Sequence, residues 1–208
     1  TALVVITSDR GLCGTYNANI IQFAERLLEK QSSRSAELVL IGKKGDDYFR
    51  KRRSVFLSYL DLAGKPDYER ISHITKQLTE GYLSGQFRAV HLVYTASRAA
   101  MSIRPVSVKL LPLEVPKVCG NRVKTYLEPD PQTILDQLLP EVVASTIYVS
   151  ILEAFTSENS ARMIAMKNAT DNAKEMIRHL TLLRNKARQA AITKELLEIV
   201  TAGEIFRR

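Results

Sequence analysis

The residues best suited to do chemistry lie in one turn near the start of the chain. Thr7 to Asn17 reads Thr-Ser-Asp-Arg-Gly-Leu-Cys-Gly-Thr-Tyr-Asn. This turn follows a strand-like apolar run and precedes a helical pattern, which is where an α/β fold can hold a phosphate. Its glycines, Gly11 and Gly14, fit neither the G-x-G-x-x-G nor the G-x-x-x-x-G-K-[ST] spacing. We therefore favour a structural turn over a nucleotide site, and we expect no cofactor.

The other reactive side chains do not form a recognisable set. Cys13 precedes a helix, where the pKa of a thiol can be lowered, but it lacks a C-x-x-C partner. With Cys119 as the second of only two cysteines, the chain has too few for a disulfide framework. His73, His91 and His179 are single histidines, which are more often surface or core residues than ligands or bases. The sequence thus predicts neither a catalytic residue nor a metal site.

Charge narrows the function only slightly. The chain has 208 residues and a net charge of +8, which would suit nucleic acid, an anionic membrane surface or an acidic protein partner. Its densest basic cluster, Lys43-Lys44 and Arg50 to Arg53, is interrupted by Asp46 and Asp47. Because no nucleic-acid motif accompanies this cluster, we favour a solvated helix face over phosphate contact. No uncharged apolar run reaches about eighteen residues, so we expect no membrane span.

The distribution of helix breakers divides the chain into two parts. Gly and Pro are frequent up to Pro140, whereas neither occurs between Glu141 and Ala202. That segment predicts one very long helix, roughly 90 Å at about 1.5 Å per residue. Asp130 and Pro131 suit the N-cap and the first turn, and Gly203 suits the end. Pro140 is expected to kink or interrupt the first turns.

The predicted helix carries an apolar seam. The seam positions follow an alternating spacing of three and four residues: Ala173, Met176, Leu180, Leu183, Ala187, Ala190, Lys194 and Leu197. This spacing is typical of a coiled coil. Since isolated helices draw little stability from propensity alone, the seam predicts a partner helix.

Strand and helix patterns alternate in the first 120 or so residues. The expected strands are Ala2–Thr7, Glu37–Ile41, Ala89–Thr95 and Val106–Leu113, and the expected helices are Asn17–Lys30, Gly45–Arg53 and Pro66–Ser84. Such alternation predicts a parallel sheet covered by helices, with room for an antiparallel edge.

Three separated stretches resemble one protein family. Ile6 to Asn17 resembles the first strand and turn of the globular domain in the gamma subunit of F-type ATP synthases. Ala161 to Ala173 and Ala187 to Val200 are similar to the C-terminal helix of that family. The resemblance implies an α/β fold, with a Rossmann-like sheet domain at 1–128 and one very long coiled-coil helix at 129–208. It also implies that the N-terminal helix, the antiparallel partner in this family, is missing from this chain.

The implied function is that of a central-stalk rotor. Such a subunit couples proton flow through the membrane ring to ATP synthesis or hydrolysis on the beta subunits, and it is not a catalyst by itself. The implied partners are the alpha, beta and epsilon subunits and the membrane c-ring, with no nucleic acid. The implied location is peripheral, on the cytoplasmic face of a bacterial inner membrane or the equivalent membrane of an organelle. A basic coiled-coil nucleic-acid-binding protein and an α/β enzyme with a helical dimerisation arm stay open as alternatives.

The resemblance also implies contact residues. Arg188, Gln189, Thr193 and Glu195 match the region of the family that contacts the beta subunits. Glu128 matches the foot that faces the membrane ring. These five residues are the expected rotor–stator and membrane-ring contacts.

Overall fold

The computed structural model describes residues 1–30, 36–62, 67–97, 103–114 and 128–205. The chain forms two compact units, Thr1–Met163 and Ile164–Arg208. The first unit includes the sheet, its covering helices and the beginning of the long helix, and we call it the sheet unit. The second unit is the remainder of the long helix, and we call it the helical unit. The division at 128/129 that the sequence suggests stays a prediction.

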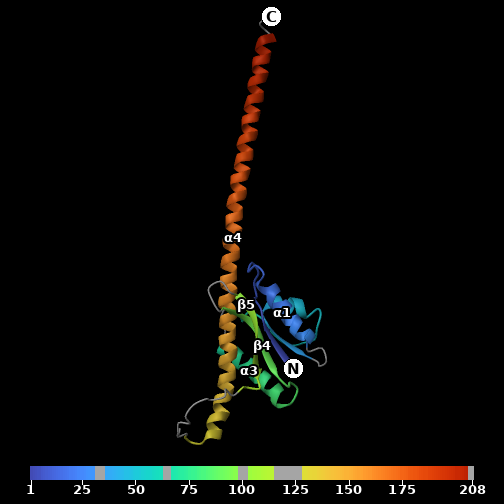
Figure 1. Cartoon of the computed structure of the whole chain (residues 1–208), viewed down its shortest axis with the longest axis vertical. Coiled ribbons are helices and arrows are strands. Elements are labelled where there is room, and N and C mark those ends of the chain that lie inside the picture. The colour runs from blue at the N-terminus through green and yellow to red at the C-terminus, as the bar shows by residue number, and fades with distance from the viewer. Residues whose placement is uncertain (31–35, 63–66, 98–102, 115–127, 206–208) are drawn as a thin grey trace. The chain divides into compact units, whose positions relative to one another are not determined.

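The sheet unit is built on five strands (Figure 1). They are β1 (Ala2–Ile6), β2 (Glu37–Ile41), β3 (Val55–Tyr59), β4 (Val90–Ser97) and β5 (Ile103–Leu111), arranged in the order β3-β2-β1-β4-β5. β3, β2, β1 and β4 are parallel, and β5 pairs antiparallel with β4. The predicted parallel sheet with an antiparallel edge is therefore confirmed.

Helices cover both faces of the sheet. They are α1 (Tyr16–Lys30), α2 (Lys43–Phe49), α3 (Tyr68–Leu83) and α4 (Pro131–Ile205). Leu3 and Val5 of β1 join the core formed with α1 and α2, whereas Ala2 and Val4 join the core formed with α3 and the first part of α4. Because both faces are buried, β1 is apolar at every position instead of alternating.

Two elements near the basic cluster differ from the prediction. β3 was not expected, because Val55–Tyr59 is a short edge strand whose side chains are mostly half-exposed, so its apolar signal is weak. The predicted helix Gly45–Arg53 is instead α2, Lys43–Phe49. It begins earlier because Gly42, with φ of 101°, turns the chain directly after β2.

The long helix is more continuous than the sequence suggests. Pro140 lies inside α4 and does not interrupt it, so the predicted interruption is wrong, whereas a kink at this position stays a prediction. α4 extends through Gly203 to Ile205, two residues beyond the predicted end. The predicted N-cap is confirmed, since Asp130 Oδ1 accepts a hydrogen bond of 2.9 Å from the backbone N–H of Thr133. Hydrogen bonds from the Thr133 side chain and backbone lower the pKa of Asp130.

One stretch of α4 is apolar enough to cross a membrane by length and composition. An 18-residue window has a mean hydropathy of 1.5, and 33% of that window is buried inside the structure. The core helix of a soluble protein meets the same criterion. Val143, Ile147, Ile151 and Ala154 of α4 are buried in the core that covers the sheet. This burial favours a core helix over a membrane span.

Candidate functional site

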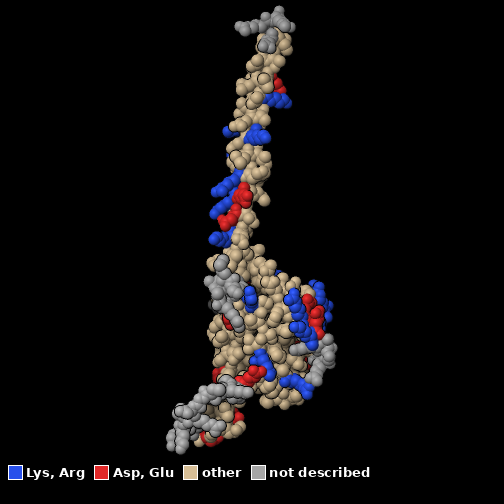
Figure 2. Space-filling model, viewed as in Figure 1, with Lys and Arg blue, Asp and Glu red and all other residues tan. Residues whose placement is uncertain are grey.

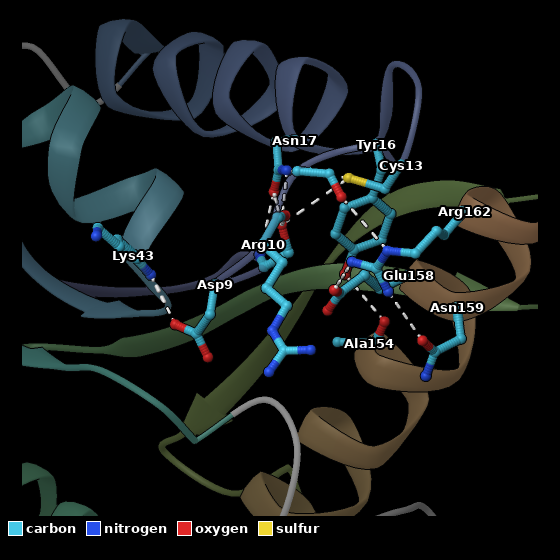
Figure 3. Close-up of polar contacts among 12 residues, drawn as sticks. Asp9, Arg10, Cys13, Tyr16, Asn17, Lys43, Ala154, Glu158, Asn159 and Arg162 are labelled. Carbon is cyan, nitrogen blue, oxygen red and sulfur yellow. Dashed lines mark hydrogen bonds and ion pairs between the residues drawn. The ribbon is translucent and has the colours of Figure 1, made fainter. Parts of the chain in front are cut away.

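The turn after β1 is tied to the start of α2. Thr7 Oγ1 accepts a hydrogen bond of 2.9 Å from the backbone N–H of Gly45 and lies 3.3 Å from the carbonyl oxygen of Gly42. Asp9 Oδ1 accepts a hydrogen bond of 2.9 Å from the backbone N–H of Lys43, as Figure 3 shows. These polar groups hold two neighbouring βα turns together at the carboxyl ends of the strands.

The rest of the turn is held by Asn17, in the first turn of α1. Its side-chain oxygen accepts a hydrogen bond of 3.1 Å from the backbone N–H of Ser8, and its amide donates to Ser8 Oγ at 2.7 Å. The same amide lies 3.2 Å from Cys13 Sγ, which is buried at 3% exposure (Figure 3). Since these groups bind one another, the geometry supports the structural turn rather than a phosphate site.

A buried polar junction joins this part of the sheet unit to α4. The hydroxyl of Tyr16, the first residue of α1, donates to the carbonyl oxygen of Ala154 at 3.0 Å (Figure 3). Ser157 Oγ donates to the carbonyl oxygen of Thr95 in β4 at 2.9 Å. Sequence reasoning missed both bonds, because their partners lie 138 and 62 positions apart and no local pattern links them.

An ion pair lies next to this junction. Glu158 is buried at 4% exposure and pairs with Arg162 one turn later in α4. Arg162 also donates to Asn159 Oδ1 at 2.9 Å, and its Nε lies 3.4 Å from the carbonyl oxygen of Gly11 (Figure 3). Burial, and then the charge of Glu158, raises the pKa of Tyr16. The Tyr16 phenol is therefore a neutral hydrogen-bond donor at physiological pH.

The four predicted stator-contact residues all lie in the helical unit. Arg188, Gln189, Thr193 and Glu195 are exposed on α4. Thr193 Oγ1 donates to the carbonyl oxygen of Gln189 at 2.9 Å, which places these two residues on one face. Arg188 and Glu195 are seven positions apart and lie near a common face. Their contact role stays a prediction.

The large apolar side chains of the seam in the helical unit are exposed. Met176, Leu180, Leu183 and Leu197 have exposed fractions of 64%, 56%, 50% and 63%. Figure 2 shows Lys, Arg, Asp and Glu side chains of both signs on the upper part of α4. A helix with solvated charges on some faces and an exposed apolar seam is suited to binding another helix or a surrounding protein surface.

Glu128, the predicted membrane-ring contact, is exposed and lies just ahead of α4. Its contact with a membrane ring also stays a prediction.

The isolated histidines and cysteines gain no catalytic setting in the described ranges. His73 Nδ1 lies 3.0 Å from the hydroxyl of Tyr59. Burial, and then the charge of Lys109, lowers the pKa of the half-buried His91. Among the described residues, no group of three or more His, Cys, Asp or Glu side chains could hold a metal ion. Cys119 lies outside those residues.

The basic cluster around α2 is partly structural. Asp46 is nearly buried and accepts hydrogen bonds from Arg50 at 2.9 Å and from Ser58 at 2.7 Å. The Arg52 guanidinium lies 4.1 Å from the ring centre of Tyr48. Asp46 therefore joins α2 to β3 through Ser58, Arg50 neutralises the Asp46 carboxylate at the end of α2, and Arg52 covers an aromatic face. This arrangement agrees with a solvated helix face.

Comparisons with known proteins agree with one another. The family model described as ATP synthase matches residues 1–204. The ATP synthase gamma chain of Anaeromyxobacter sp. strain Fw109-5 is 43% identical over 210 residues, covering 99% of this chain and 72% of that one. The gamma chain of Moorella thermoacetica is 41% identical over 205 residues, covering 98% and 72%.

Solved structures have the same fold. A chain of the Tetrahymena thermophila mitochondrial ATP synthase, from a structure of its central stalk and c-ring, matches with a TM-score of 0.65 and 26% identity. That match covers 81% of this chain and 75% of the other. A chain of the Euglena gracilis mitochondrial ATP synthase matches with a TM-score of 0.71 and 20% identity, covering 97% and 71%.

The comparisons give no support to the nucleic-acid-binding alternative. The family model and both bacterial relatives extend over nearly all of this chain, and each relative is matched over 72% of its own length. The chain therefore belongs to the ATP synthase gamma chain family.

Proposed function

We propose that this chain is the central-stalk rotor subunit of an F-type ATP synthase. In this role it turns with the membrane ring and presents different faces of α4 to the surrounding catalytic subunits. The observation that carries the proposal is α4 itself, a single helix from Pro131 to Ile205 whose seam in the helical unit is exposed. The similarity to ATP synthase gamma chains supports the same role.

The mechanism is a coupling between rotor angle and nucleotide affinity. A helix with unlike faces interacts differently with each conformation of a catalytic subunit, so each angle favours one conformation over the others. Turning the helix then moves the catalytic subunits through their states in order. Hydrolysis in the reverse direction drives the same helix the other way.

The proposed partners are the subunits that this coupling connects, the catalytic ring and the membrane ring. Alpha and beta subunits surround the helical unit, and Arg188, Gln189, Thr193 and Glu195 contact the beta subunits at particular angles. Epsilon and the c-ring bind at the other end, where exposed Glu128 faces the ring. The exposed seam is covered by a second helix in an antiparallel coiled coil. The protein is peripheral, on the cytoplasmic face of a bacterial inner membrane or the equivalent organelle membrane.

The chain is proposed to be non-catalytic. Within the described residues, the polar groups of the first turn bind one another, and no cluster suited to a metal is found. ATP hydrolysis is therefore assigned to the surrounding subunits, and the chain is expected to bind no cofactor of its own.

Reconstitution tests this assignment. Purified alpha and beta subunits are mixed with a full-length gamma chain that carries this sequence, and ATP turnover is measured for the mixture and for each component. The expected result is no turnover by the gamma chain alone and stimulated turnover by the mixture. Turnover by the isolated gamma chain, abolished by a substitution within it, would overturn the assignment.

A further inference from the structure

Two buried hydrogen bonds that run in opposite directions join one turn of α4 to α1 and to β4. Tyr16 donates from α1 to the backbone of α4, and Ser157 donates from α4 to the backbone of β4. Their α4 positions, Ala154 and Ser157, are three residues apart and so lie on one face within a single turn. The two bonds therefore fix one turn of α4 to two different elements of the sheet unit.

These bonds are sheltered from water. Tyr16 is 4% exposed, Ser157 is fully buried and Ala154 is 2% exposed. The small Ala154 side chain lets the Tyr16 ring approach the helix backbone. Buried hydrogen bonds do not compete with water and are electrostatically stronger than exposed ones.

The two hydrogen bonds resist rotation of α4 about its own axis more strongly than the apolar core around them does. Val143, Ile147 and Ile151 hold α4 on the sheet through contacts that are not directional. Such contacts resist separation more than they resist a small rotation of the helix about its own axis. Hydrogen bonds weaken steeply when their angle changes, so they resist that rotation.

We propose that Tyr16 and Ser157 are positioning residues that fix the rotational setting of the first part of α4 against α1 and β4, so that torque passes between the sheet and the helix without slip. This inference rests on the proposed rotor function. α4 continues past Met163 as the helical unit. In the proposed rotor, the sheet unit receives torque from the membrane ring and the helical unit passes it to the catalytic subunits. Weakening the two bonds makes the connection torsionally softer while it leaves the catalytic subunits intact.

The test uses the complete ATP synthase containing a full-length gamma chain with this sequence. The junction variant is Tyr16→Phe with Ser157→Ala, which removes both donors and keeps the ring and the helix. The matched control is Tyr48→Phe with Ser150→Ala. Tyr48 donates to Glu25 at 2.7 Å, and buried Ser150 donates to Thr146 within α4 itself at 2.8 Å. Neither control bond joins α4 to another helix or strand.

Two activities are compared in each variant. ATP-driven proton pumping into membrane vesicles requires torque to pass through the junction, whereas ATP hydrolysis by the detached catalytic complex does not. The ratio of pumping to hydrolysis is expected to fall about threefold or more in the junction variant and to stay at the wild-type value in the control. An equal ratio in the junction variant, the control and the wild type overturns the inference.

A second measurement separates slip from loss of folding. Angular fluctuations of a probe on the sheet unit are recorded while the catalytic complex waits for ATP, and the junction variant is expected to give a broader distribution than the control. If the double variant does not assemble, Tyr16→Phe and Ser157→Ala are measured singly, and distributions as narrow as wild type overturn the inference. Failure of the proposed rotor function gives a different result from failure of this inference. If the chain were not the rotor, vesicles with wild-type ATP synthase would pump protons equally well with and without the gamma chain.

Discussion

At the scale of single residues, the turn after β1 is organised by close packing against the next turn. Gly42 has φ of +101°, and a Cβ atom there would lie 2.2 Å from the carbonyl oxygen of Thr7. Both the backbone conformation and the space exclude a side chain. Thr7 and Asp9 therefore reach the start of α2 only because residue 42 is glycine.

This packing predicts a large effect for Gly42→Ala. The variant should lose about 2–4 kcal/mol of unfolding free energy, from a strained backbone and an overlap with backbone atoms. Denaturant unfolding of the purified protein measures the loss. Gly11→Ala is the control, because nothing lies within 4 Å of its Cβ position, and its effect should stay within about 0.5 kcal/mol. Equal stabilities for the two variants would contradict the packing described for this turn.

Tyr16 predicts a specific dependence on alkaline pH. Its pKa is raised from 10.0 in the folded state by burial and by Glu158, so folding favours the neutral phenol. The contribution of the neutral Tyr16 phenol to the free energy of unfolding is complete below pH 10.0. It is lost as the pH rises from there toward the pKa of Tyr16 in the folded state. At neutral pH, Tyr16→Phe should be about 1 kcal/mol less stable than wild type because of the lost hydrogen bond.

The same comparison at higher pH gives the test. The stability difference between wild type and Tyr16→Phe should shrink above pH 10.0, since only the wild type loses the contribution of this phenol. Denaturant unfolding across about pH 8–11 measures the difference. A difference that stays constant over that range would show that burial of the neutral phenol does not stabilise the fold.

Residue roles in this region are only partly readable from sequence. The pattern Thr7 to Asn17 predicts a structural turn, and the bonds from Asn17 to Ser8 agree with it. The junction made by Tyr16 and Ser157 is not readable, because it depends on how α4 packs against the sheet. Side-chain bonds to distant carbonyl oxygens leave no periodic signal in the sequence.

At the scale of elements, the sequence predicts strongly patterned segments best. The apolar pattern predicts β2 with its observed bounds, and the run without Gly or Pro indicates α4. β3 was missed because it is a half-exposed edge strand, and α2 was misplaced because Gly42 starts it earlier than its residues suggest. Pro140 lies inside α4, and the helix that follows it packs on the sheet through Val143 and Ile147.

The exposed face of the helical unit carries the next prediction. Thr193 donates its hydroxyl hydrogen to the carbonyl oxygen of Gln189, so both residues present polar groups on one face. In a dehydrated bearing, hydrogen bonds from such neutral groups to charged side chains of the surrounding subunits are worth about 1.5–3 kcal/mol each. Gln189→Ala and Thr193→Val should each lower ATP turnover and proton-coupled synthesis about tenfold, with little change in assembly yield.

Thr181→Val is the matched control for this prediction. Thr181 is also exposed and donates to the carbonyl oxygen one turn earlier, at Ile177, over 2.8 Å. Thr181→Val and Thr193→Val therefore each remove one hydroxyl-to-carbonyl bond of the same kind, at different positions of the helix. Equal turnover and coupling in Thr193→Val, Gln189→Ala and Thr181→Val would reduce Gln189 and Thr193 to solubilising surface.

At the scale of the whole molecule, function follows from surfaces rather than from a pocket. The net charge of +8 does not choose a partner by itself, and the charges on the helical unit are mixed in sign (Figure 2). What selects the rotor role is a long helix with an exposed seam, joined to an α/β unit of the ATP synthase gamma chain family. The sequence predicted this arrangement, whereas it could not predict which bonds connect its parts.

Single-molecule rotation tests the rotor role most directly. A complex of alpha and beta subunits with a full-length gamma chain carrying this sequence is fixed to a surface through its alpha and beta subunits, so that the gamma chain is free to turn. A bead is attached to a cysteine introduced in the gamma chain at exposed Arg53. Cys119 is replaced with Ser, and Cys13 is buried at 3% exposure. The label therefore reacts with the introduced thiol and not with a native cysteine. On addition of ATP, the bead should rotate continuously in one direction. A bead that stays at a fixed angle while the same complex hydrolyses ATP would contradict the rotor function.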